Sequence, residues 1–294
     1  MSSAQGFLLI DKAGGMTSHD VVAKMRKRFG TKRVGHAGTL DPMATGVLVL
    51  GVGNATRLMQ YITDGTKAYD ATVSLGVSTH TDDREGDVTA TVSGQVLATV
   101  TNAQIEEVLA TFVGTIKQRP SSVSAIKIDG KPAHQRIRDG ETVDIPEREV
   151  TISQLSINDI RRTSSTIEID ISVTCSAGTY IRAIARDLGE ALKVGGHLTQ
   201  LRRTLVSPFS LSECAPLETA ELTPIVDGIG RIFPLRNLDF EEMAEISFGR
   251  YLNPNSQSGI VVAVSPQGDF AALLENKVIA AKELAAPILV AVKE

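Results

Sequence analysis

A single carboxylate stands in a stretch of small residues where it could do chemistry. Asp41 lies within GHAGTLDPMATG, residues 35–46, and no other acid occurs between Asp20 and Asp64. General acid–base catalysis by a carboxylate usually involves a second acid or a histidine, whereas a nucleophilic carboxylate needs only a cation or hydrogen bonds that keep it ionised and aimed. Asp-Pro is also common turn chemistry. The segment alone therefore permits two interpretations, a turn and a catalytic carboxylate.

Other short motifs indicate chemistry only weakly. GVGNAT, residues 51–56, follows an apolar run as a dinucleotide-binding turn does, but Thr56 replaces the third glycine and no ribose-binding acid follows. LLIDKAGGMT places Asp11 as the aspartate of a phosphoaspartyl phosphatase is placed, without the later Mg²⁺-binding acids. The five histidines and two cysteines lack ligand spacing. We therefore expect no metal and no small-molecule cofactor.

The composition is that of a globular protein. Of the 294 residues, 42% are hydrophobic and 22% are charged. No apolar run approaches the roughly 20 residues that a membrane span needs, and the N-terminal FLLI run is too short for a signal peptide. Two cysteines without paired spacing are typical of a reducing compartment. We expect a cytoplasmic monomer with no membrane partner.

Basic side chains gather in two places, although the net charge of the chain is −4. The first cluster contains Lys24, Arg26, Lys27, Arg28, Lys32 and Arg33, and the second contains Lys117, Arg119, Lys127, Lys131, Arg136 and Arg138. Such clusters either neutralise phosphates or form solvated helix faces. Charge alone leaves both interpretations open.

The spacing of apolar residues places these motifs on elements. MTSHDVVAKMRKRFG predicts a helix capped by Thr17 or Ser18, with its basic residues largely off the apolar stripe. NATRLMQYI predicts a helix capped by Asn54. KAYDATVSLG alternates as a half-buried strand does. GTYIRAIARDLGEALKVGG predicts a helix with Arg182 and Arg186 on one face, because the two are four residues apart.

The order of elements predicts an α+β fold. The strands alternate polar and apolar residues and have short links, which favours a mixed, largely antiparallel central sheet with flanking helices over a doubly wound parallel sheet. From about residue 236 the composition turns acidic and the strands become short. We predict a main domain over residues 1–235 and a small β-rich C-terminal domain over 236–294. Residues 120–149 are irregular, basic and rich in Pro, Gly and Ser, and form a long excursion from the core.

Several stretches together resemble the TruB family of tRNA pseudouridine synthases. GHAGTLDPMATGVLVLGVGNATR resembles the family signature with its GxLDPxAxGxL core, and the other stretches follow in family order over nearly all of residues 6–211. These are GFLLIDKAGGMTSHDVV, KAYDATVSLGVSTHTDDREGDV, CSAGTYIRAIARDLGEAL and HLTQLRRTLVSPFSL. Ala13 departs from the family pattern, which usually has Pro after the Lys. The C-terminal piece loosely resembles the small RNA-binding PUA domain.

The resemblance implies a fold and an activity. It implies a pseudouridine synthase-like sheet and the cofactor-free isomerisation of uridine 55 in the T loop of tRNA. The N1–C1′ bond breaks and a C5–C1′ bond forms after the nucleotide is flipped out of its stack. Asp41 would be the catalytic aspartate, and Arg182 would keep it ionised and placed. Whether Asp41 attacks C1′ or removes a sugar proton stays open.

The same resemblance implies the remaining site residues. Tyr69 would stack on the uracil, Tyr180 and Leu201 would line the pocket, and His36 would fill the stack that the flipped base leaves. The first basic cluster and the excursion 120–149 would grip the phosphates of the T stem-loop.

Two other classes of function stay open. One is a non-catalytic tRNA-binding or folding protein that has the same fold. The other is a phosphatase acting through Asp11, which a strict Mg²⁺ requirement would favour. The presence of both Asp41 and Arg182 argues against a protein that has lost its activity.

Overall fold

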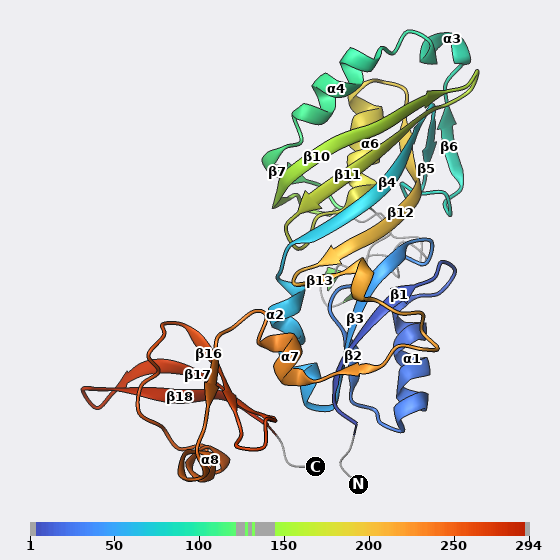
Figure 1. Ribbon diagram of the computed structural model, residues 1–294. Coiled ribbons are helices and arrows are strands. Elements are labelled where there is room, and N and C mark those ends of the chain that lie inside the picture. Colours follow the sequence, from blue (N-terminus) through green and yellow to red (C-terminus); the bar gives the residue numbers. More distant parts are fainter. Residues whose placement is uncertain (1–3, 122–126, 129–130, 133–144, 292–294) are drawn as a thin grey trace.

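A long sheet runs through the larger part of the chain in this computed structural model, which describes residues 4–121, 127–128, 131–132 and 145–291 (Figure 1). Its strand order is β14 (Leu222–Thr223), β1 (Gly6–Lys12), β3 (Thr45–Val52), β12 (Gly196–Val206), β4 (Lys67–Leu75), β11 (Ile167–Cys175), β10 (Arg148–Arg162) and β7 (Gly114–Gln118), with β2 (Val34–His36) beside β3 and β13 (Phe209–Ser210) beside β12. The pairings are antiparallel except that of β3 with β12. The predicted mixed, largely antiparallel sheet is confirmed.

The short parallel pairing joins the two halves of the sheet. Thr45 and Gly46 of β3 lie opposite Arg202 and Arg203 of β12. A Cβ atom on Gly46 would lie 2.2 Å from the carbonyl oxygen of Arg203, and the φ of Gly46 is +99°, so only glycine fits at this crossing. The crossing brings the segment before β3, which carries Asp41, next to β12.

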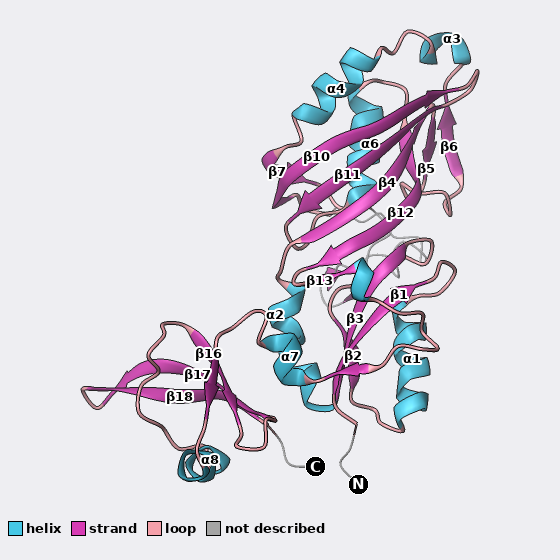
Figure 2. Cartoon of the chain, viewed as in Figure 1, coloured by secondary structure: helices cyan, strands magenta, loops and turns pink. Residues whose placement is uncertain are grey.

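Helices cover the sheet because its strands alternate (Figure 2). Leu8 and Ile10 of β1 pack into one core with α1 (Ser18–Phe29), α4 (Asn102–Ala110) and α6 (Ile181–Ala191). Phe7 and Leu9 point to the opposite face, into a second core with α2 (Met59–Thr63) and α7 (Ile225–Ile229). α6 packs on one face of the sheet against β4 and β12.

Two helix starts test the predicted caps. Thr17 is the N-cap of α1, and Asp20 completes a capping box with it. The prediction for Asn54 is wrong: Gly53–Leu58 form a 3₁₀ helix before α2, and no side chain caps its start. Asn54 instead donates from Nδ2 to Gln5 Oε1 over 3.0 Å, so its side chain ties the N-terminal segment to this turn.

A smaller sheet follows at the C-terminus. Its order is β15 (Leu235–Asn237), β16 (Ile260–Val264), β17 (Phe270–Ile279) and β18 (Lys282–Val290), with α8 (Phe240–Ser247) packed on it. The expected β-rich C-terminal region is confirmed. In Figure 1, α2 and α7 lie between this sheet and the large one. The predicted division at residue 236 falls within β15 and stays a prediction.

The remaining elements are short. They are β5 (Val77–Thr79), β6 (Val88–Thr91), α3 (Gly94–Leu97), β8 (Lys127–Ile128), β9 (Lys131–Pro132) and a 3₁₀ turn at Leu211–Glu213. β8 and β9 pair with each other within the predicted excursion 120–149. The other residues between 122 and 144, including Arg136 and Arg138, lie outside the described residues, so the excursion stays a prediction.

Candidate active site

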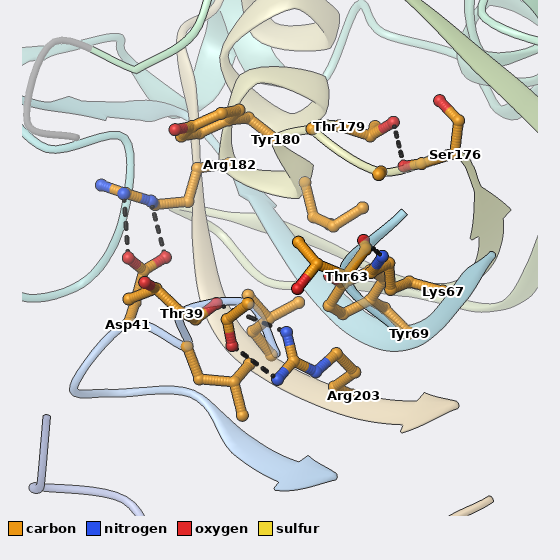
Figure 3. Close-up of a pocket in the computed structure, with 16 residues that line it drawn as sticks. Thr39, Asp41, Thr63, Lys67, Tyr69, Ser176, Thr179, Tyr180, Arg182 and Arg203 are labelled. Carbon is orange, nitrogen blue, oxygen red and sulfur yellow. Dashed lines mark hydrogen bonds and ion pairs between the residues drawn. The ribbon is translucent and has the colours of Figure 1, made fainter. Parts of the chain in front are cut away.

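A cavity of about 250 Å³ opens where four segments of the large sheet and its helices meet (Figure 3). They are the Asp41 loop (residues 37–44), β4, β12 and the segment 176–182 that leads into α6, and Thr63 at the end of α2 also lines the cavity. Figure 3 shows Asp41 with Arg182 on one side of the cavity and Tyr69 with Lys67 on the other. Every predicted site residue except His36 lines this cavity: Asp41, Tyr69, Tyr180, Arg182 and Leu201.

Asp41 and Arg182 form a two-pronged ion pair. The distances are 3.0 Å from Arg182 Nη2 to Asp41 Oδ1 and 3.0 Å from Arg182 Nε to Asp41 Oδ2. Arg182 is 4% exposed, and its Nη1 donates to the carbonyl of Thr81 over 2.8 Å and lies 3.3 Å from Asp83 Oδ2. A parallel guanidinium–carboxylate pair fixes direction as well as charge. Arg182 therefore aims Asp41 and is itself held by a second carboxylate.

Burial dominates the protonation of Asp41. It raises the pKa of Asp41 above its ordinary value, the Arg182 guanidinium is the strongest opposing influence, and the Asp83 carboxylate adds to the rise. Lys12 is also buried, and its burial lowers its pKa to about 8, although the negative charge of Asp41 opposes that shift. Without Arg182, the Asp41 carboxylate would take up a proton at a still higher pH.

Hydrogen bonds from side chains of α1 and β1 hold the Asp41 loop in place. Ser18 Oγ accepts a hydrogen bond from the backbone N–H of Leu40 at 2.9 Å and donates to its carbonyl at 3.2 Å. Lys12 Nζ donates to the carbonyls of Met16 and Pro42 at 2.7 and 3.3 Å. The Asp41 carbonyl also accepts from the N–H of Ala44 at 3.1 Å, so the predicted turn exists and carries the carboxylate into the cavity.

Tyr69 and Leu201 line the cavity from neighbouring strands. Tyr69 lies on the face of β4 that also carries buried Ala71, and Leu201 of β12 pairs in register with Ala71. Leu201 is 7% exposed. Burial raises the pKa of the Tyr69 hydroxyl, and the charge of Arg203 opposes part of that rise. An aromatic ring and an aliphatic side chain thus line the same cavity as the carboxylate, and a planar group could stack between them.

Tyr180 enters the cavity from the N-cap position of α6. Its backbone N–H donates to Gln118 Oε1 at 2.8 Å, and Gln118 Nε2 donates to its carbonyl at 3.0 Å. The Arg148 guanidinium lies 4.9 Å from the centre of the Tyr180 ring. These contacts fix the ring two residues before Arg182.

His36 lies at the end of β2 and is not part of the cavity wall. Its ring meets the ring of His19 edge-on, with centroids 5.6 Å apart. Burial lowers the pKa of His36, and the proximity of His19 adds to the effect. His36 is five residues before Asp41, so it is carried by the same segment.

Two residues of the site were not identified from the sequence. Asp83 is 3% exposed and braces Arg182, while its neighbour Asp82 pairs with Arg186 at 3.3 Å. The predicted common face of Arg182 and Arg186 explains why adjacent aspartates serve both. The second residue that the sequence did not reveal is Arg203, which lines the cavity although only 1% of its surface is exposed to solvent. The sequence DDREGD, residues 82–87, contains several acidic side chains, but no local pattern predicts which of them contacts Arg182.

The first basic cluster divides into bound and solvated side chains. Arg26 Nη2 donates to the carbonyl of Val34 at 3.1 Å, and Arg28 Nη1 donates to that of Leu217 at 3.3 Å. Lys27 and Lys32 are exposed. Arg26 and Arg28 contribute hydrogen bonds to the fold although they too are exposed, and the lysines remain accessible to a ligand.

The phosphatase alternative finds little support in this arrangement. Asp11 lies outside the cavity wall and pairs with Arg202 over 2.7 Å. In the described part of the chain, no group of three or more His, Cys, Asp or Glu side chains could hold a metal ion. Within the same ranges, no helix is both long and apolar enough to cross a membrane.

The cavity instead combines an arginine-paired carboxylate with an aromatic side chain.

Known sequences match the chain along most of its length. Residues 26–181 match the TruB family pseudouridylate synthase N-terminal domain, and residues 182–224 match the tRNA pseudouridylate synthase B C-terminal domain. The chain is 50% identical over 277 residues to the tRNA pseudouridine synthase B of Corynebacterium diphtheriae, covering 92% of each. It is 51% identical over 282 residues to that of Corynebacterium jeikeium, covering 94% of this chain and 92% of the relative.

Solved structures share the fold. One is described as "Structure of H/ACA RNP bound to a substrate RNA containing 2'-deoxyuridine" and superposes with a TM-score of 0.68 at 22% identity. The match covers 98% of this chain and 85% of that chain. It supports the architecture of the large and small sheets, independently of the sequence relatives.

Proposed function

Because the chain belongs to the TruB family of pseudouridylate synthases and isomerises uridine to pseudouridine in tRNA, we propose that its target is uridine 55 in the T loop. The observation that carries the proposal at the site is the Asp41–Arg182 pair facing Tyr69 across one cavity. The relatives that share half of the sequence are enzymes by name, so a non-catalytic binding protein is not favoured.

The reaction rearranges bonds within one nucleotide. The N1–C1′ bond breaks, the detached uracil turns, and C5 bonds to C1′. C5 then loses its hydrogen and N1 gains one, so the atoms balance without a cofactor. The chemistry needs a base held flat while it turns and a group that acts at the sugar. Tyr69 supplies the first and Asp41 the second.

Asp41 acts in its ionised form. Arg182 holds both carboxylate oxygens, which keeps the charge in place despite the burial that raises the pKa of Asp41. Tyr69 stacks on the uracil from the opposite wall. Tyr180 and Leu201 close the pocket around the base and exclude water from the reacting bonds.

The uridine must leave its stack to reach this cavity. Flipping costs a few kcal/mol of lost stacking, least where the base is already in a loop. His36 projects from the segment that carries Asp41 but stays outside the cavity wall. That position suits a ring that occupies the vacated stack while the uridine occupies the cavity.

The phosphates of the T stem-loop meet basic side chains outside the cavity. Lys27 and Lys32 are exposed on and after α1. The excursion 120–149, with Lys127 and Lys131, adds a second basic segment along the chain. We place the protein in the cytoplasm as a monomer that acts on tRNA and needs no cofactor.

Substrate variants test the target. We expect a tRNA transcript labelled with tritium at C5 of its uridines to release tritium with the wild-type protein and EDTA present. Replacing uridine 55 with cytidine should abolish release, whereas replacing a uridine outside the T loop should not. Undiminished release from the transcript with cytidine at position 55 would refute the proposed target.

A further inference from the structure

The largest fully buried side chain of the described residues is a charged one, Arg203. Its Nε donates to the carbonyl of Val47 at 2.8 Å, its Nη2 to that of Gly38 at 3.1 Å and its Nη1 to that of Thr39 at 3.3 Å. Within the part of the chain that the structure describes, the ion pairs found do not include Arg203. Figure 3 shows its guanidinium against the Asp41 loop. The guanidinium therefore binds two backbone carbonyls of the Asp41 loop and one of β3.

The backbone of Arg203 connects the same loop to a second strand. Arg203 pairs with Gly46 of β3 on one side and with Tyr69 of β4 on the other. A Cβ on Gly38 would lie 3.6 Å from Arg203 Nη1, an ordinary van der Waals distance, so the guanidinium lies beside the loop at Gly38. One residue thus contacts both walls of the cavity.

An unpaired charge at this depth is costly. Removing a guanidinium from water without a carboxylate partner is unfavourable, and carbonyl acceptors offset only part of the cost. An apolar side chain would fill the space without that cost, but it could not hold the carbonyls of Gly38 and Thr39. The rigid, planar set of donors is what distinguishes arginine at this position.

We propose that Arg203 is a positioning residue for pseudouridine formation. It fixes the Asp41 loop relative to the strand that carries Tyr69, so the carboxylate reaches the sugar of a nucleotide whose base lies on the ring. This inference rests on the roles proposed above for Asp41 and Tyr69. Displacement of a reacting group by about 1 Å lowers the rate about 100-fold, so a loosened loop should affect the rate more than binding.

The test compares Arg203→Met with Arg202→Met. Arg202 is the neighbouring residue on β12, but its side chain donates to Asp11 and Thr45 and does not line the cavity. Tritium release is measured in single turnovers with saturating enzyme, tRNA affinity by filter binding and the folded fraction by circular dichroism. We expect Arg203→Met to lower the single-turnover rate about 100-fold. Its tRNA affinity should stay within about threefold of wild type, and Arg202→Met should react at nearly the wild-type rate.

A merely structural role gives a different result. It would lower the folded fraction but leave the rate per folded molecule unchanged, and that outcome would overturn the inference. Arg203→Lys keeps the charge if Arg203→Met does not fold, and it should react more slowly than wild type because a compact ammonium group lacks the planar fork of donors that reaches the separate carbonyls of Val47, Gly38 and Thr39. A wild-type rate for folded Arg203→Lys would also overturn the inference.

Asp41→Asn, measured in parallel, distinguishes failure of the role proposed for Asp41 from failure of the role proposed for Arg203. If Asp41→Asn turns over, the proposed role of Asp41 fails whatever the Arg203 variants do. If Asp41→Asn is inactive while folded Arg203→Lys and Arg203→Met react at the wild-type rate, only the role of Arg203 fails.

Discussion

At the scale of single side chains, one arginine is shared by two carboxylates. Arg182 contacts Asp41 with two nitrogens and Asp83 with Nη1 at 3.3 Å. Burial raises the pKa of Asp41, Arg182 opposes the rise and Asp83 adds to it. Arg182 therefore favours the ionised form of Asp41, the carboxylate that we propose as catalytic, and Asp83 holds Arg182 in place.

This balance predicts the acid side of the pH–rate profile. A carboxylate with a raised pKa takes up a proton as the pH falls through that pKa. As the pH is lowered, activity should therefore begin to fall before the pH reaches 3.8, the ordinary pKa of Asp. Arg182→Met should move the acid limb to higher pH and lower the neutral rate about 100-fold or more. Asp83→Asn should move the limb to lower pH. Single-turnover rates across pH would contradict the prediction if the acid limb stayed in place in Arg182→Met.

A buried lysine near Tyr69 predicts a pH dependence of stability. Burial lowers the pKa of Lys67 from 10.5 to about 8. Between these values the unfolded chain holds a proton that the folded protein lacks, so the free energy of unfolding should rise with pH, by up to about 3 kcal/mol. Lys67→Met should lose this contribution, and the exposed Lys27→Met should keep it. Urea unfolding measures this free energy at each pH from 7.5 to 10.5. The same increase with pH in wild type and Lys67→Met would contradict the prediction.

At the scale of elements, the start of α1 sets the position of the Asp41 loop. Thr17 caps the helix, and the next residue, Ser18, makes two hydrogen bonds to the backbone of Leu40. The helix is thereby fixed to the residue that precedes Asp41. A capping sequence and a loop anchor occupy neighbouring positions, but their effects on the protein should differ.

Ser18→Ala and Thr17→Ala separate these effects. Ser18→Ala leaves a buried N–H and a carbonyl of Leu40 without their partner, which should cost about 1–3 kcal/mol of unfolding free energy and also lower the single-turnover rate. Thr17→Ala removes a cap, which should cost about 1 kcal/mol and leave the rate unchanged. Urea unfolding and tritium release measure the two quantities. Equal rates for the two variants would show that Ser18 does not position the loop.

The sequence predicts elements better than it predicts their meeting points. Apolar spacing correctly located α1, α6 and the strand that carries Tyr69, because local burial determines each of them. The Asn54 cap was wrong because that side chain binds Gln5, far away in the sequence. The contact of Arg203 with the loop carbonyls depends on the parallel crossing of β3 and β12, and that of Arg182 with Asp83 depends on the bridge from Asp83 to Leu198 of β12. No local pattern encodes that register.

At the scale of the whole molecule, the small sheet is attached through a shared apolar core. Leu273 and Val262 of that sheet are fully buried in the same cluster as Phe7 and Ile62. Arg57 adds a hydrogen bond to the carbonyl of Val290 at 2.6 Å. The exposed lysines that we propose for RNA contact, Lys27 and Lys32, lie elsewhere, on and after α1. The molecule thus separates the attachment of its C-terminal sheet from the surface that we propose for tRNA.

That separation predicts which charges set the salt dependence of binding. Each phosphate contact contributes roughly 0.7–0.9 to the slope of log affinity against log salt. Replacing Lys27 and Lys32 together with Gln should lower the slope by roughly 1.4–1.8 and weaken binding at low salt. Lys277→Gln, on the small sheet beside Glu275, should leave the slope unchanged. An unaltered slope in the double variant would exclude α1 from the RNA surface.

The most direct measurement compares the wild-type protein with Asp41→Asn on one substrate. The substrate is a tRNA transcript labelled with tritium at C5 of its uridines, with EDTA present throughout. We predict tritium release by the wild type, none by Asp41→Asn, and tRNA affinities within about threefold of each other, because Asn keeps the shape of the carboxylate but not its charge. Release by Asp41→Asn at the wild-type rate would contradict the assignment of Asp41 as the catalytic carboxylate.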